Sequence, residues 1–171
     1  CISISLDGKT VCSGSRDRTV RLWDASKGSL SRAMSGHSDA VNAVALNTDA
    51  SLVYSGSDDK SIKEWDATSG VCLRTLLGHT DTVFSVCLSV DGKHLYSGSW
   101  DDTVGVWDLK EGLRARIMSC CRRMFCKDGV LIRRMKWHTK SVISVCESDG
   151  IIVSGSLDTT VKKWNPSTGK C

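Results

Sequence analysis

Short runs in which apolar and polar residues alternate recur along the chain. Val41, Ala43 and Ala45 alternate with Asn42 and Val44. A similar alternation runs through residues 83–87. Such runs, rich in Val and other β-branched residues, are typical of β-strands, whose successive side chains point to opposite faces. Asp7-Gly8, Asp91-Gly92 and Asp149-Gly150 lie between such runs and predict tight turns, because Gly accepts a positive φ. No stretch carries a helical period, so the pattern predicts an all-β protein.

A longer pattern repeats four times. The motif SGS-x-D-x-x-[VI]-x-x-W-[DN] occupies residues 13–24, 55–66, 97–108 and 154–165. Its Trp residues lie 42, 42 and 57 positions apart, and a His precedes each of the last three motifs. Two of these His residues follow a Gly. A period of this length indicates a repeat architecture in which each unit contributes one supersecondary element.

These units resemble WD40 repeats by their G-H, SGS-x-D and W-D signatures. The resemblance covers essentially the whole chain except residues 109–128 and implies an all-β WD40 β-propeller. Four blades would be present in an incomplete ring, each an antiparallel four-stranded sheet. The chain begins inside the first strand of a blade and stops where an outer strand begins. We therefore expect a fragment of a longer propeller; the alternative is that two chains pair, as a homodimer, to complete one ring.

The alignment of the four units predicts the blade boundaries. The first blade is truncated at its N-terminus, the third contains an insertion, and the fourth lacks its outer strand. The predicted blades span residues 1–35, 36–77, 78–137 and 138–171.

Ser, His, Asp and Trp recur together, where the serine is the first or the third residue of the SGS motif. A catalytic triad is normally built once, so the repetition favours a buried structural relay in which every polar group is paired. Asp would accept from His, His from Ser, and Ser from the Trp indole N–H, and similarity to the WD40 structural tetrad supports this. In the first unit the His would precede residue 1. The predicted sets are His37, Ser55, Asp59 and Trp65; His79, Ser97, Asp101 and Trp107; and His138, Ser154, Asp158 and Trp164.

The insertion at 109–128 distinguishes the third unit from the second. It carries six basic and two acidic residues, a net charge of +4 that equals the charge of the whole chain. Three interpretations stay open: a solvated loop, a basic docking loop for an acidic partner or nucleic acid, or a sequence artefact such as a translated intron. Its cysteines, Cys120, Cys121 and Cys126, do not have a usual zinc spacing.

The remaining chemistry of the sequence argues against an enzyme. It contains no phosphate-binding loop, HExxH motif, CxxC pair or nucleophile elbow, so we expect no catalysis, cofactor or metal. No apolar run approaches the 18 residues of a membrane span. The nine cysteines favour reduced thiols and an intracellular location, in the cytoplasm, the nucleus or both.

Function is then expected from the surface of the repeats. We predict a non-catalytic scaffold or adaptor that binds proteins or peptides, including acidic or phosphorylated ones. It would belong to a larger regulatory protein, such as a ubiquitin-ligase substrate receptor or a G-protein-β-like scaffold. The alternative is an RNA-associated propeller that uses the basic segment 109–136, although nucleic acid is the less favoured partner. By similarity to the family, the turns after the SGS motifs and the loops at the His residues form the contact face. The candidates are Arg16, Arg18, Asp58, Lys60, Trp100, Asp102, Leu157 and Lys140.

Among these candidates Trp100 is the strongest. The other units carry Arg, Asp and Leu at the equivalent position, so the repeat does not require a Trp there. An exposed Trp is a typical interface anchor. The competing interpretation is that Trp100 packs against a neighbouring blade.

Overall fold

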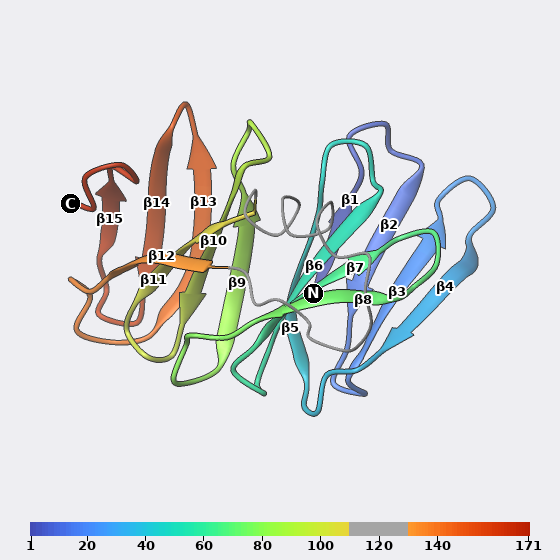
Figure 1. The fold of residues 1–171 in the computed structure, drawn as a ribbon, viewed down its shortest axis with the longest axis horizontal. Coiled ribbons are helices and arrows are strands. Elements are labelled where there is room, and N and C mark those ends of the chain that lie inside the picture. The colour runs from blue at the N-terminus through green and yellow to red at the C-terminus, as the bar shows by residue number, and fades with distance from the viewer. Residues whose placement is uncertain (110–129) are drawn as a thin grey trace, which may run out of the picture.

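A computed structural model describes residues 1–109 and 130–171, and every regular element in these ranges is a β-strand. The strands form four antiparallel sheets, called blades 1 to 4 in chain order (Figure 1). Blades 1 to 3 have four strands, and blade 4 has three in the described ranges. This architecture confirms the predicted all-β fold with four blades, of which the last has no fourth strand in the described residues.

Each blade takes its strands in chain order, and each strand pairs with its predecessor. The predicted Asp-Gly turns join first and second strands, with Gly8, Gly92 and Gly150 at φ of 70°, 66° and 74°. Blade 1 contains β1 (Ile2–Ile4), β2 (Thr10–Gly14), β3 (Thr19–Asp24) and β4 (Ser29–Ser35); blade 2 contains β5 (Val41–Leu46), β6 (Leu52–Ser57), β7 (Ile62–Asp66) and β8 (Cys72–Leu76); blade 3 contains β9 (Val83–Leu88), β10 (His94–Ser99), β11 (Val104–Asp108) and β12 (Val130–Met135); blade 4 contains β13 (Val142–Ser148), β14 (Ile151–Ser156) and β15 (Val161–Trp164).

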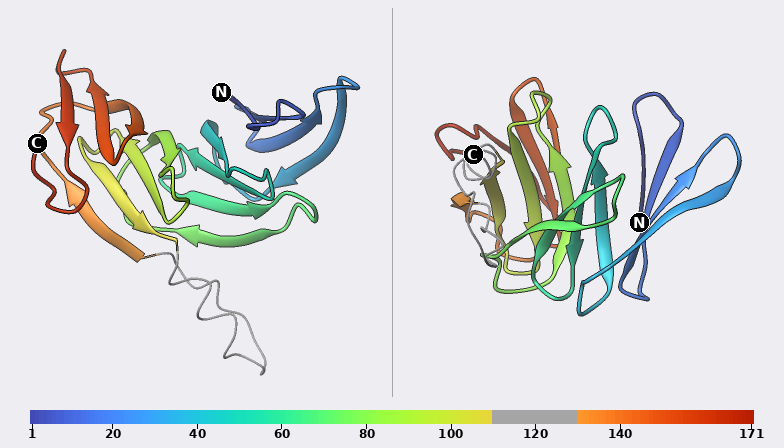
Figure 2. Two further views of the ribbon diagram at one scale, coloured as in Figure 1. Left: turned by 90° about the horizontal axis from the view of Figure 1, so that it is seen from above. Right: turned by 45° about the vertical axis from the view of Figure 1, so that its right-hand side comes forward.

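The blades stand side by side in an open arc, with blades 1 and 4 at its two ends (Figure 2). The predicted insertion 109–128 lies outside the described residues except for Leu109, which is buried and directly follows β11. The part of the chain that the structure describes contains no helix that could span a membrane.

Hydrophobic cores fill the spaces between successive blades. Between blades 1 and 2, for example, Val20 and Met34 share a buried cluster with Val41 and Trp65. Glycine in the SGS motif makes this packing close: a Cβ on Gly56 would lie 2.6 Å from Val83 Cγ1 in the next blade. Real atoms do not approach so closely, so this position must be Gly for the next blade to pack.

One feature of the first strands departs from the sequence pattern. The pairing of β9 with β10 shifts between Ser99↔Val83 and Gly98↔Ser85, which leaves Phe84 as an extra, bulged residue. Pairing shifts in the same way past Asn42 in β5 and Ile143 in β13. A bulge interrupts the alternation of side chains and redirects the extra residue. The period of two was therefore a wrong description at Asn42 and Phe84, although it correctly indicated strands.

Candidate functional site

The turn between the second and third strands has the same geometry in every blade. One residue of each turn lies in the left-handed region: Arg18, Lys60, Asp102 and Thr159, with φ between 65° and 71°. The motif Asp before it holds the turn, as when Asp59 Oδ1 accepts from the Ser61 backbone N–H at 3.0 Å. Four equivalent turns therefore present their variable residues at the same end of the four blades.

The repeated Ser, His, Asp and Trp residues meet in blades 2, 3 and 4. In blade 2, His37 Nδ1 lies 2.7 Å from Asp59 Oδ2, and His37 Nε2 lies 2.7 Å from Ser55 Oγ. Trp65 Nε1–H donates to Ser55 Oγ at 2.8 Å. An ionised carboxylate can only accept, so Nδ1 carries the proton, and Ser55 donates its hydroxyl to Nε2.

The other two networks repeat these distances. The His79 contacts are 2.8 Å to Asp101 and 2.6 Å to Ser97, and the His138 contacts are 2.7 Å to Asp158 and 2.8 Å to Ser154. Trp107 and Trp164 donate to these serines at 2.8 Å and 2.7 Å.

Two opposing effects act on the carboxyl groups of these networks. Burial by itself would raise the pKa of Asp59, but hydrogen bonds from His37, Ser61 and the Ser38 backbone N–H outweigh burial and lower the pKa well below its usual range. Asp101 and Asp158 have lowered pKa values for similar reasons. The networks thus contain ionised carboxylates held by several donors.

The two serines of each motif have different hydrogen-bond partners. Ser55 joins the buried network, whereas Ser57 donates to the backbone carbonyl of Asp39 at 3.2 Å and accepts from the Asp59 N–H at 3.1 Å. The structure therefore resolves the alternative in favour of the first serine. Ser55, Ser97 and Ser154 are fully buried, so a substrate cannot reach their hydroxyl groups in this arrangement.

In blade 1, whose histidine position would precede residue 1, the same residue types are arranged differently. Trp23 Nε1–H still donates to Ser13 Oγ at 2.9 Å. Asp17, however, is exposed and pairs with Arg21, whose Nη2 lies 2.7 Å from Asp17 Oδ2. The carboxylate of this turn thus forms a surface ion pair.

In blades 2 and 3 the bulged residue of the first strand contacts the variable turn residue of the same blade. In blade 3, Phe84 and Trp100 pack with ring centroids 5.4 Å apart at an interplanar angle of 48°. Trp100 remains 54% exposed. It therefore packs inside its own blade and still presents an aromatic face to solvent. Sequence reasoning missed Phe84, because only the bulge directs it toward this face.

The equivalent pairs differ in chemistry from blade to blade. In blade 2, Asn42 donates to Asp58 at 2.6 Å, which makes this pair polar. In blade 4, Ile143 and Leu157 are both exposed. The face therefore changes from polar at blade 2 to aromatic at blade 3 and aliphatic at blade 4.

The other predicted contact residues surround these pairs without forming one cluster. Within the described ranges no ion pair joins any two of them. Arg16, Arg18, Lys60 and Lys140 are exposed, and Asp58 and Asp102 are half-buried.

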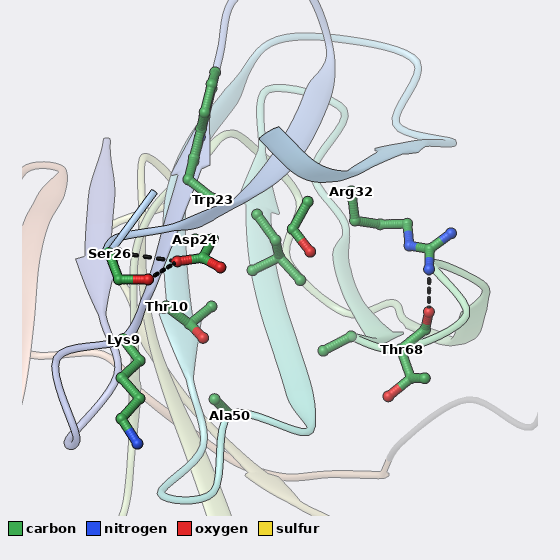
Figure 3. A pocket seen from close by; sticks show the side chains of 11 residues that line it. Lys9, Thr10, Trp23, Asp24, Ser26, Arg32, Ala50 and Thr68 are labelled. Atoms are coloured by element: carbon green, nitrogen blue, oxygen red, sulfur yellow. Dashed lines mark hydrogen bonds between the residues drawn. The ribbon is translucent and has the colours of Figure 1, made fainter. Parts of the chain in front are cut away.

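Two cavities lie at the opposite end of the blades from these turns. One, of about 440 Å³, separates blades 1 and 2, and Arg32 crosses it to donate to the Thr68 carbonyl oxygen at 2.5 Å (Figure 3). Lys9 and Asp24 line its other side. The second, of about 270 Å³, lies between blades 3 and 4, and Tyr96 and Pro166 are among the residues that line it.

The basic segment offers fewer described residues. Most of 109–136 lies outside the described ranges, so the docking-loop and RNA interpretations, and the Cys120, Cys121 and Cys126 cluster, are not placed by the structure. Arg134 and Lys136 are exposed. In residues 1–109 and 130–171, no group of three or more His, Cys, Asp or Glu residues could hold a metal ion.

Comparison with known proteins agrees with the repeated geometry. The family model "WD domain, G-beta repeat" (WD40) matches residues 1–24, 28–66, 70–108 and 129–165. Autophagy-related protein 16 of Arabidopsis thaliana is 48% identical over 46 residues, which are 27% of this chain and 9% of that protein. Nuclear distribution protein PAC1 of Mycosarcoma maydis is 38% identical over 45 residues, 26% of this chain and 10% of that protein.

The matched stretches thus span about a tenth of these curated relatives. The family match and the relatives fit a protein-interaction scaffold. Because four family matches cover most of its length, the chain belongs to the WD40 family of WD-domain, G-beta repeats.

Proposed function

We propose that this chain is a non-catalytic protein-interaction scaffold, and that the turn ends of blades 3 and 4 form its binding surface. The observation that carries the proposal is the Phe84–Trp100 pair, because a large aromatic side chain remains exposed at a turn that does not require it. Partly exposed aromatic residues supported by a neighbouring ring are typical anchors of protein interfaces.

The neighbouring blade extends this surface. Ile143 and Leu157 occupy the equivalent positions in blade 4 and are both exposed. Together with Phe84 and Trp100 they offer apolar area at two successive blades, which suits a partner segment with bulky apolar side chains. The polar Asn42–Asp58 pair of blade 2 would form one edge of the surface.

The charged residues would add selectivity. Arg16 and Arg18 are exposed in the turn of blade 1, and an arginine fork suits carboxylates and phosphates. A partner with an acidic or phosphorylated residue beyond its apolar segment would therefore complement this face. Contacts of this kind act more on association rate and selectivity than on affinity.

Three observations support a non-catalytic role. The Ser–His–Asp sets repeat in three blades, their serines are fully buried, and each serine already accepts from a tryptophan. A nucleophile would need access to a substrate, which these hydroxyl groups lack.

An intracellular role within a larger regulatory protein fits the proposal. The names of the relatives refer to autophagy and to nuclear distribution, both intracellular processes. The six described cysteines are free thiols, as expected in a reducing compartment.

The test compares Trp100→Ala with Leu6→Ala, which removes another exposed apolar side chain at the opposite end of a blade. Proteins captured by the wild-type chain are identified, and the affinity of each is then measured for both variants. We expect Trp100→Ala to weaken a partner about tenfold or more, and Leu6→Ala to have little effect. Equal affinities for wild type and Trp100→Ala, with the fold intact, would exclude this surface.

A further inference from the structure

The junctions between successive blades repeat a row of three residues, one on each of the second, third and fourth strands. In blade 2 the row is Tyr54, Glu64 and Arg74, which are directly paired in the strand register. The corresponding rows contain different residues: Cys12, Leu22 and Arg32 in blade 1, and Tyr96, Val106 and Arg133 in blade 3. Every row keeps its arginine, but only blade 2 has a carboxylate in the middle.

In blade 2 the middle carboxylate is paired with the arginine of the row. Arg74 Nε donates to Glu64 Oε2 at 2.8 Å, Arg74 Nη2 reaches the same oxygen at 2.5 Å, and both side chains are buried. Arg74 also donates to the Leu109 carbonyl oxygen of blade 3 at 3.1 Å. Burial and the negative charge of Glu64 raise the pKa of Tyr54, so its hydroxyl keeps its proton beside the pair.

Blade 3 retains the tyrosine and the arginine of this row and lacks the acid. Val106 stands at the position of Glu64, and the space beside it is the cavity of about 270 Å³. The walls of the cavity include Tyr96, Val106 and Arg133, together with His94, Ile132, Pro166 and Ser167. The Arg133 guanidinium lies against Gly169, since a Cβ there would approach Nη1 to 2.7 Å.

Arg133 forms no ion pair with a carboxylate in the described ranges, residues 1–109 and 130–171. Its side chain is half-buried. Burial, together with the negative charges of Glu147 and Asp91, raises the pKa of Tyr96 to about 12, so its hydroxyl is a hydrogen-bond donor at neutral pH. A partly desolvated arginine beside a hydroxyl donor favours a carboxylate, which can accept from both.

Blade 1 shows what happens without the tyrosine. Its row has Cys12 instead of a hydroxyl donor, and Arg32 donates to the Thr68 carbonyl oxygen at 2.5 Å (Figure 3). Its larger cavity also contains the carboxylate of Asp24. The blade 1 cavity thus has the arginine but not the tyrosine hydroxyl, so it serves as a control for the cavity of blade 3.

We propose that the cavity between blades 3 and 4 binds a glutamate side chain of a partner protein, which takes the place that Glu64 occupies in blade 2. Arg133 donates through its guanidinium fork and Tyr96 through its hydroxyl, while Val106 and Ile132 contact the methylene groups. This site lies away from the Trp100 surface, so the result at either site does not decide the other.

The first test uses the full chain and a defined probe, the peptide acetyl-Ala-Glu-Ala-amide, with acetyl-Ala-Gln-Ala-amide as its neutral match. Binding is followed by the NMR shift of the Arg133 Nε–H signal. We expect saturable binding of the Glu peptide, and an affinity for the Gln peptide that is about tenfold lower, because charged hydrogen bonds are stronger than neutral ones. Equal shifts with both peptides, or no shift with either, would overturn the proposal.

Matched variants locate the binding. Arg133→Met should abolish the shifts that the Glu peptide causes in the neighbouring Ile132 and Ser167 signals, whereas Arg32→Met, at the equivalent position of blade 1, should leave them unchanged. Tyr96→Phe should weaken binding less than Arg133→Met does. Retained binding in Arg133→Met would assign the peptide to another surface.

The second test places the acid inside the chain. Val106→Glu should fold, because its carboxylate can reach the same two donors as in blade 2, and it should block the peptide. Val106→Gln is the control. Arg133→Met should lower the melting temperature of Val106→Glu by more than it lowers the melting temperature of the wild type. If Val106→Glu unfolds while Val106→Gln folds, the cavity does not accept a carboxylate. If neither folds, the Arg133→Met titration still decides the question.

Discussion

The inner blades and the end blades use the same residue types with different results. In blade 3, which has neighbours on both sides, Asp101 is held in a buried network by His79. In blade 1, at one end of the arc, Asp17 lies on the surface and pairs with Arg21 (Figure 2). The carboxylate of the repeat thus belongs to a buried network in blade 3 and to a surface ion pair in blade 1.

Blade 4, at the other end, shows the same contrast in packing. Its Val161 corresponds to Val104 of blade 3, but Val161 is 73% exposed and Val104 is completely buried. Likewise, a Cβ on Gly98 would meet Val142 at 2.8 Å, whereas a Cβ on Gly155 would meet nothing within 4 Å. The packing residues are thus present on both blades, and only the inner one is covered by a further blade in this structure.

The largest effect is expected from removing a buried histidine. His79→Ala leaves Asp101 ionised in the interior and deprives Ser97 of its acceptor. We expect a loss of about 3 kcal/mol in the free energy of unfolding, measured by denaturant titration. Asp17→Ala in blade 1 should cost only a small fraction of this, because its pair is exposed. Similar losses for both variants would contradict the distinction between buried and surface networks.

A glycine pair tests the packing contrast. Gly98→Ala should destabilise by about 1–3 kcal/mol, because the added methyl group overlaps with Val142 and Val145 of the next blade. Gly155→Ala should be neutral or slightly stabilising, since its methyl group enters open space. Thermal unfolding of the two variants measures the difference, and an equal loss in both would show that the backbone, not the neighbouring blade, requires glycine.

Acid should act more strongly on the inner networks than on blade 1. The pKa of Asp59 is lowered on folding, so its contribution is present in full above the ordinary carboxyl pKa of about 3.9 and is lost as pH falls below it. Asp59→Asn should therefore be less stable at pH 7 but lose less on acidification than the wild type. Denaturant midpoints between about pH 5 and 2 measure the slope. Asp17→Asn should change this slope less, and the reverse order would contradict the comparison.

The smallest effect concerns the left-handed turn of blade 4. Thr159 has a φ of 69°, which is strained for a β-branched residue, whereas asparagine adopts this conformation readily. Thr159→Asn should stabilise by about 0.5–1 kcal/mol, measured by thermal unfolding. Asp102→Asn, at a φ of 65° in blade 3, should change little because aspartate already tolerates it. No gain from Thr159→Asn would show that the turn is not strained.

The repeat in the sequence was sufficient to predict the strands, their antiparallel order and the residues that meet in the networks. It was sufficient because each network joins residues at fixed distances within the repeat, such as Ser55 and Trp65. It was not sufficient for Phe84, whose direction depends on a bulge that the alternating pattern conceals. It also missed the Glu64–Arg74 pair, since a charged pair in a strand register cannot be distinguished by pattern alone from two solvated residues.

The bulge has a consequence for how such a protein can change. The bulge turns a residue such as Phe84 outward, so this residue does not pack in the interior as the nearby Val83 and Val86 do. The turn residue opposite, such as Trp100, is held by its backbone N–H on the Thr82 carbonyl and not by its side chain. Blades 2, 3 and 4 therefore each have two positions, the bulged residue and the turn residue, at which substitutions change the surface chemistry without changing the packed interior. Changes at these few positions are enough to let the same scaffold bind different partners.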